Sequence, residues 1–236
     1  MVGSARWESD LLSGPEYALY QNRLIHSVPV LPLTQGEVKD LLRSREQLLG
    51  MKFDGKTGDD LAWISSGYPY VANTLARLSC LLWLTKNYRE AFSSVKGGFL
   101  GWFVQLFRKE SKDEGLFSAL GVKISDEELR ATVAAFSQSA NAKSIQWYRK
   151  LVLQGSEDAA DAIRIVQSVA CAEEPIGLPS IAAQLGCAEQ RILLLIEQFC
   201  SGMVEVDDQQ RLDIVSQELR WYSRSVEYLS PSVAFP

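Results

Sequence analysis

The chain has 236 residues, of which 47% are hydrophobic and 22% are charged, so it can bury the core of one domain or of two small ones. Its formal net charge of −5 excludes a general attraction to nucleic acid or to an anionic membrane, and such binding would need a local basic patch. The four cysteines form no C-x-x-C pair and His26 is the one histidine, so the sequence predicts free thiols and no metal site.

Signals for membrane insertion and export are weak in this sequence. The two most apolar runs, 75–84 and 97–107, are shorter than the roughly 20 residues that a membrane-spanning helix needs. Residues 1–20 carry charges and a Gly-Pro step where a secretory signal would have an apolar run. We therefore expect a protein without a transmembrane segment, in the reducing cytoplasm.

The first predicted elements are a short strand and a capped helix. Residues 28–33 are typical of a strand. Thr34 and Glu37 follow directly as a capping box, whose hydroxyl and carboxylate satisfy the first free amides of a helix. The apolar spacing from Val38 onward predicts that this helix continues until Gly50 ends it.

Two further helices are expected next. A short one opens at Asp59 and runs through Ser66, and Gly67 ends it. Pro69 then stands where a first-turn proline is tolerated, because its missing N–H would have no partner there. The apolar residues that follow keep one face as far as about Thr85, where we expect this helix to end.

The segment 97–121 has no assigned counterpart, and it starts with an aromatic and basic stretch. Arg108, Lys109 and Lys112 lie beside a broad apolar face that consists of Phe99, Leu100, Trp102, Phe103, Leu106 and Phe107. Two interpretations stay open: a packed core helix, or an exposed helix that binds a partner or a membrane surface. If the chain contacts DNA, we expect weak binding that uses the basic stretch 86–112 more than the C-terminal region.

A second capping box, Ser125 with Glu128, predicts another helix, and the spacing from Ile145 to Val152 predicts one more. Gly155 marks the expected domain boundary. Beyond it we expect helices over 158–172 and 178–185, and a third helix that follows at once and closes at Ser201-Gly202. Its inward residues are Ile192, Leu195, Ile196 and Phe199. Strands over 203–206 and 211–215 then form a two-strand hairpin. This order resembles a winged helix, and a final helix over 217–229 is expected to pack back on the domain or on a neighbour.

A winged helix often reads DNA with its third helix and its wing, which makes Arg191 and Arg211 candidate contacts for DNA or for a partner. The charge of the region disfavours DNA, because residues 178–236 hold four arginines against eight carboxylates. Asp207 and Asp208 would stand at the tip of the wing and repel the phosphate backbone. Contact with a protein is therefore the favoured interpretation.

Residues 50–57 match the Walker A pattern, with Lys56 and Thr57 in the phosphate-binding positions. A working phosphate loop follows a strand and leads into a long helix, whereas here a capped helix precedes it and Asp59 and Asp60 lie where the anion would bind. We interpret the match as accidental. The other carboxylates are scattered at helix starts and form no acid and base pair, so no catalytic residue is predicted.

The strand and Pro-Leu-Thr entry at 30–34, the helix to Leu49 and the Gly-x-Pro step at Gly67 and Pro69 resemble the lid of AAA+ or STAND P-loop ATPases. With the winged helix, the chain is most similar to the origin-recognition-type branch and its bacterial relatives. The resemblance implies a mainly α fold, a helical AAA+ lid-like bundle followed by a winged-helix domain. Its expected parts are a remnant of the ATPase core at 1–33, a lid-like domain at 34–155 with an insertion at about 97–121, and the winged helix at 156–236.

The same resemblance implies nucleotide-sensing roles for three residues. Ser4 falls at the first sensor and Arg23 at the arginine finger for a neighbouring subunit, and Arg77 is a weak substitute for the second sensor because Tyr70 stands directly after the proline. The intact parent would use ATP and magnesium, whereas this chain alone is expected to bind no cofactor.

The function expected from these features is the C-terminal regulatory and oligomerisation half of an ATPase switch, without the core needed to hydrolyse ATP. A protein partner or a homo-oligomer is expected, since a lid normally packs against its core and the aromatic face at 99–107 has no evident cover. Two rivals stay open: a stand-alone winged-helix DNA-binding regulator, and a P-loop enzyme that uses Lys56 and Thr57.

Overall fold

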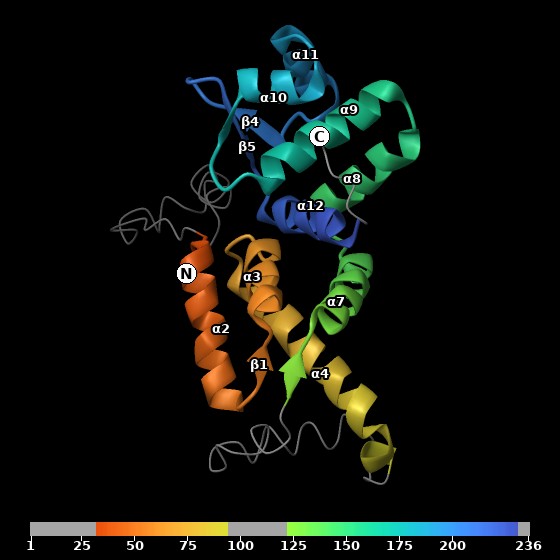
Figure 1. The fold of residues 1–236 in the computed structure, drawn as a ribbon. Coiled ribbons are helices and arrows are strands. Elements are labelled where there is room, and N and C mark those ends of the chain that lie inside the picture. The colour runs from red at the N-terminus through yellow and green to blue at the C-terminus, as the bar shows by residue number, and fades with distance from the viewer. Residues whose placement is uncertain (1–31, 94–121, 231–236) are drawn as a thin grey trace, which may run out of the picture. The chain divides into compact units, whose positions relative to one another are not determined.

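The computed structural model describes residues 32–93 and 122–230, and these residues are mainly helical, as the sequence predicts (Figure 1). The elements in chain order are α2 Gln35–Leu49, β1 Lys52–Phe53, α3 Gly55–Ile64, α4 Pro69–Ser93, β2 Lys123–Ile124, α7 Asp126–Ser139, α8 Lys143–Gln154, α9 Glu157–Cys171, β3 Ile176–Gly177, α10 Leu178–Leu185, α11 Glu189–Phe199, β4 Val204–Val206, β5 Arg211–Ile214 and α12 Gln217–Leu229. Within the two described ranges, no helix combines the length and the apolar character needed to cross a membrane.

The predicted helix caps are confirmed. Thr34 Oγ1 accepts a hydrogen bond from Glu37 N at 3.2 Å, and Glu37 Oε2 accepts one from Thr34 N at 2.8 Å, which completes the capping box of α2. Gly50 ends α2 in the left-handed conformation, with φ of 65°. The second capping box, Ser125 with Glu128, opens α7. Local side-chain chemistry sets these boundaries, so the sequence is enough to find them.

Three predicted boundaries differ from the structure. α3 begins at Gly55 rather than Asp59, because the carboxylate of Asp54 accepts a hydrogen bond from Thr57 N at 2.7 Å and caps the helix earlier. α4 continues to Ser93 rather than ending near Thr85, since no glycine or proline interrupts residues 86–93. Of the strand predicted over 28–33, residues 28–31 lie outside the described ranges, and residues 32 and 33 are in no strand.

Leu33 pairs with the turn before α4. Its N–H donates to Gly67 O at 3.0 Å, and a Cβ added to Gly67 would lie 2.1 Å from Leu33 O. Ser66 and Gly67 have φ of 53° and 75°, so two successive residues adopt the left-handed conformation. Pro69 follows as the first residue of α4. The Gly-x-Pro step is therefore a tight turn that holds the backbone just before α2.

A two-residue parallel ladder joins segments that are far apart in the sequence. Lys52 N donates to Val122 O at 2.9 Å and Asp54 N donates to Ile124 O at 3.1 Å, which pairs β1 with β2. The sequence does not predict this ladder, because two residues are too few to show an alternating pattern.

The region after Gly155 has the predicted order of helices and hairpin, with one added strand. β3, between α9 and α10, pairs antiparallel with β5, so the sheet has the order β3-β5-β4. The apolar side chains of α9, α10 and α11 cover a core that includes Ile165, Ile181 and Ile192, each of them fully buried. The sequence does not predict β3, because two residues are too few to show an alternating pattern.

The helix α12 lies between the two halves of the described chain. It packs on α8 and α9 on one side and on α3 and α7 on the other (Figure 1). Arg224 is 7% exposed and donates three hydrogen bonds to backbone carbonyls: to Ala170 O at 2.6 Å, Trp63 O at 2.8 Å and Ala172 O at 2.9 Å. One buried side chain therefore binds the C-terminal ends of both α3 and α9.

Candidate interaction surface

The helix α11 has one buried face and one exposed face. Ile192, Leu195 and Ile196 are buried against the rest of the C-terminal module, residues 156–230. Leu193 is 40% exposed and Leu194 is 63% exposed. The apolar spacing of the sequence predicts the buried face, but it does not explain two leucines on the outer one. Figure 1 shows α11 at the end of the module that is remote from α4. An exposed leucine pair on this helix is a candidate contact for another molecule.

Arg191, one of the two arginines predicted to contact DNA or a partner, is held by carboxylates of α9. Its Nη2 atom lies 2.9 Å from Asp158 Oδ1 and 3.1 Å from Asp161 Oδ2. The hydrogen bond to Asp161, and then the negative charge of Asp158, raise the pKa of the Arg191 guanidinium. The positive charge that DNA would need on the third helix is therefore neutralised by acids of the same chain.

Arg211, the other predicted contact, is paired in the same way at the hairpin. Its side chain lies 2.7 Å from Asp207 Oδ2, and Asp207 Oδ1 also accepts the backbone N–H of Arg211 at 2.8 Å and of Gln209 at 2.9 Å. Donation from Arg211 and Gln209 lowers the pKa of the Asp207 carboxyl. The tip of the hairpin is thus built around an ionised aspartate, which would face a phosphate backbone.

These pairs lead to a prediction for DNA binding. We expect the third helix and the hairpin to add nothing to the affinity for a random DNA duplex at physiological salt, because Arg191 and Arg211 are paired with carboxylates. Fluorescence anisotropy with a labelled duplex checks this, beside an Asp158→Asn, Asp161→Asn variant that frees Arg191. Micromolar binding by the parent chain that is lost in Arg191→Ala would contradict the prediction.

The residues proposed to sense nucleotide are only partly described. Gly67 and Pro69 form the turn into α4, and Arg77 lies on α4 two turns later with an exposed side chain. Ser4 and Arg23 fall outside the described residues, as do Lys109, Lys112 and the aromatic stretch 97–107. Of the three proposed sensor residues, the described part of the chain therefore contains Arg77 alone.

The segment that matches the Walker A pattern directly follows the capped helix α2, as the sequence predicts, and the strand β1 lies inside the match rather than before it. β1 is two residues long and Gly55 opens α3 directly after it. The position that would bind a phosphate is taken by the carboxylate of Asp54, which accepts the N–H of Thr57 at 2.7 Å. The Thr57 side chain is fully buried. Because an aspartate already caps this helix, the segment is unsuited to phosphate.

Lys56 of the same segment lies near carboxylates, at a polar cluster where α3, α7 and α12 meet. Tyr228 OH donates to Asp126 Oδ1 at 2.5 Å, and Arg130 Nε donates to Asp126 Oδ2 at 2.7 Å. Hydrogen bonds donated by Tyr228 and then by Arg130 lower the pKa of Asp126. Burial raises the pKa of Asp60, and the negative charge of Asp126 adds to this shift. The positive charges of Lys56 and Arg130 oppose it. The cluster ties the C-terminal end of α12 to α7.

Asp60 gives a prediction for the pH dependence of stability. The pKa of Asp60 is raised in the folded chain, so ionisation of its carboxyl opposes folding. The resulting loss of stability is absent at a pH below the ordinary pKa of 3.8, and it is complete at a pH above the raised pKa of the folded chain. Asp60→Asn should therefore raise the melting temperature at neutral pH and leave it unchanged at a pH below 3.8. The matched control is Asp59→Asn, which removes an exposed ion pair with Lys39 and should give no gain.

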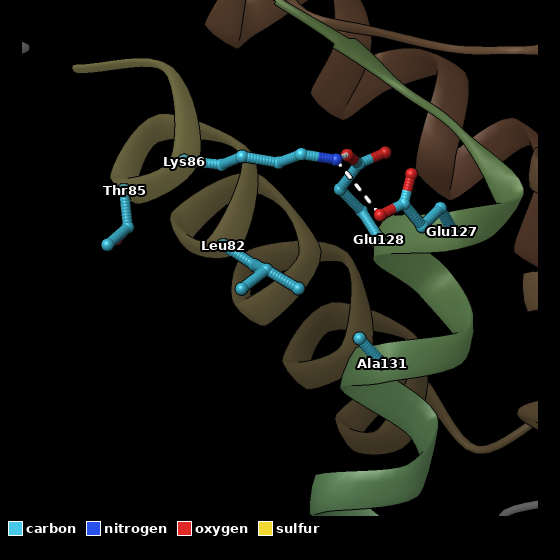
Figure 2. A pocket seen from close by; sticks show the side chains of 6 residues that line it. All are labelled: Leu82, Thr85, Lys86, Glu127, Glu128 and Ala131. Carbon is cyan, nitrogen blue, oxygen red and sulfur yellow. Dashed lines mark hydrogen bonds and ion pairs between the residues drawn. The ribbon is translucent and has the colours of Figure 1, made fainter. Parts of the chain in front are cut away.

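An open groove of about 540 Å³ lies between α4 and α7 (Figure 2). Lys86 reaches across it from α4, and its Nζ atom lies 3.0 Å from Glu127 Oε1 and 3.4 Å from Glu128 Oε1. Leu82 and Ala131 supply apolar walls. The lysine is neutralised by two carboxylates, so this groove offers no unpaired base and no activated nucleophile.

A second hollow of about 320 Å³ lies between α7, α8 and α12. Arg149 Nη2 donates to Ser137 O at 2.6 Å, and Arg149 Nε donates to Tyr222 OH at 3.2 Å. The guanidinium thereby caps the C-terminal end of α7, where backbone carbonyls lack helical partners. Arg149 therefore has a structural role in this hollow, and its contacts form no catalytic arrangement.

The thiols are buried or half-buried free cysteines, as predicted from the sequence. Burial raises the pKa of Cys171 to about 11 and that of Cys200 to about 12. Thiols with such values are protonated at neutral pH, so they are poor nucleophiles. No group of three or more potential metal ligands occurs among residues 32–93 and 122–230.

Sequence reasoning missed Arg224, Arg149 and Tyr228, which hold helix ends together. Each of these residues lies on or next to an apolar helix face. A charged or hydroxyl side chain at such a core position indicates a buried hydrogen bond, and this is the sequence signal that could have found them. No protein-family model matches the chain, and no curated protein is significantly similar to it.

Proposed function

We propose that this chain is the regulatory and oligomerisation half of an ATPase switch, a lid-like helical bundle joined to a winged-helix module, acting in a cytoplasmic setting. The observation that carries the proposal is the position of α12, whose Arg224 binds the C-terminal ends of α3 and α9 together. A movement of the bundle would therefore be transmitted to the module that carries α11.

The arrangement of the C-terminal region supports the winged-helix part of the proposal. Its helices and strands follow the order α9, β3, α10, α11, β4, β5, and the three strands form one antiparallel sheet. A winged helix has this combination of three helices and a hairpin, with the third helix free to contact a ligand. The ion pairs of Arg191 and Arg211 favour a protein over DNA as that ligand.

The bundle supports the lid-like part less directly. Its Gly-x-Pro turn at Gly67 and Pro69 resembles the corresponding step of AAA+ lids, and Asp54 rather than a phosphate caps α3. The chain would thus act on nucleotide held by a separate core, and ATP with magnesium would belong to that core.

Two measurements on the purified chain test the proposal. Titration with a fluorescent ATP analogue should show no saturable binding in the micromolar range, and Lys56→Ala should behave as the parent does. Calorimetry should show one cooperative unfolding transition, because α12 couples both halves. Micromolar ATP binding that Lys56→Ala abolishes would favour the P-loop enzyme instead, and two independent transitions in the parent would remove the proposed relay.

A further inference from the structure

The exposed leucines of α11 lie on one continuous face. Gln190 and Leu194 are four residues apart, as are Leu193 and Glu197, so these four side chains share one side of the helix. Leu194 is 63% exposed, and the residues that bury the helix, such as Leu195, point to its opposite side. The outer face therefore presents two leucines with polar neighbours and no cover from the described residues.

Acidic residues lie on α11 itself and beside Arg191, which comes two positions before the leucine pair. On the side of Arg191, the first turns of α9 supply Asp158 and Asp161, and Glu157 also contributes to the raised pKa of Arg191. Glu189 and Glu197 lie on α11 itself. The basic residues of the same region are Arg191 and Arg164, and Arg164 is paired with Asp161 at 3.4 Å. Five negative and two positive charges leave a local net charge of −3.

We propose that this face of α11 binds an amphipathic helix of a protein partner, whose apolar anchors are flanked by lysine or arginine. The inference rests on the proposed function and names the partner class for its winged-helix module. A helix bound in this way uses apolar anchors at i, i+3, i+4 and i+7, which would contact the leucine pair. Its basic flanks would complement the nearby carboxylates.

Other occupants fit the charge less well. A DNA phosphate backbone and an anionic membrane surface would both be repelled by a face with an excess of carboxylates. A second copy of this chain would bring two acidic faces together, which like-charge repulsion disfavours. A basic helix is the occupant for which both the apolar pair and the nearby carboxylates are favourable.

The test uses a fluorescent peptide of about 18 residues, built from leucine and lysine as an amphipathic helix, and a counterpart with glutamate in place of lysine. Anisotropy should show binding of the lysine peptide to the full chain and none of the glutamate peptide. Leu194→Ser should weaken the binding by at least about tenfold, since an anchor at the centre of a contact dominates affinity. Glu197→Lys should also weaken it, and added salt should weaken it further.

Leu153→Ser is the matched control, because Leu153 is an 84% exposed leucine on α8 outside this face. The control should bind the peptide as the parent does, and circular dichroism should show that all three variants stay folded. Equal binding by Leu194→Ser and the parent, or equal loss in Leu153→Ser, would overturn the inference. A parent chain that is a dimer in light scattering, with Leu194→Ser a monomer, would also overturn the inference, since a second copy would then be the occupant. The calorimetric test of coupling does not involve this face, so the two proposals fail independently.

Discussion

Replacing Gly67 with alanine is expected to lower the free energy of unfolding by about 3 kcal/mol or more, the sum of strain and a lost contact. The left-handed conformation at Gly67, with φ of 75°, costs an alanine roughly 1–2 kcal/mol. Its Cβ would also lie 2.1 Å from Leu33 O, so the backbone before α2 must move and the hydrogen bond from Leu33 N to Gly67 O is lost. Thermal unfolding should show a melting temperature lower by roughly 6–12 °C.

Gly186→Ala separates the two causes of this loss. Gly186 also has a positive φ, of 65°, but no atom lies within 4 Å of the position that a Cβ would take. Its replacement should therefore cost only the conformational part, about 1 kcal/mol. If Gly67→Ala and Gly186→Ala lose the same stability, the close approach of Leu33 contributes nothing and the expectation for Gly67 is wrong.

Arg224→Met should destabilise the chain by about 3–5 kcal/mol, because it leaves three backbone carbonyls without a donor in the interior. Methionine keeps much of the length of the side chain, so the change removes chiefly charge and hydrogen bonds. The guanidinium also lies over the ring of Trp63, 5.3 Å from its centre. Burial, followed by the nearby Arg220, lowers the pKa of Arg224 to about 10, so the side chain remains charged at neutral pH.

The same variant tests the coupling of the two halves. Since Arg224 binds the ends of α3 and α9, calorimetry of Arg224→Met should show a broadened or divided transition where the parent shows one. Arg224→Lys should lie between the two, because an ammonium reaches fewer of the carbonyls. Arg164→Met, which removes an exposed arginine of α9, should change stability by less than about 0.5 kcal/mol. A comparable loss in Arg164→Met would show that Arg224 has no special role.

The sequence by itself determines the helices and their caps. Thr34 with Glu37, Ser125 with Glu128, and the glycines after α2, α8 and α10 act within one turn of the chain, so their effects are readable from neighbouring residues. The hairpin and α12 follow in the same way from alternation and from a 3.6-residue apolar period. The earlier start of α3 was also readable in principle, since Asp54 is a favourable N-cap residue.

Only the tertiary structure decides which residues meet across the chain. The partners of Arg224 are 161 residues away at Trp63 and 54 away at Ala170, and no local pattern encodes such distances. The pairing of β1 with β2, and of Arg191 with Asp158 and Asp161, depends equally on how the helices pack. Net charge could suggest that the third helix avoids DNA, but only packing shows that its arginine is neutralised while Leu194 stays exposed. Capping and periodicity are short-range effects, whereas the charge and cover of a surface depend on every element that packs around it.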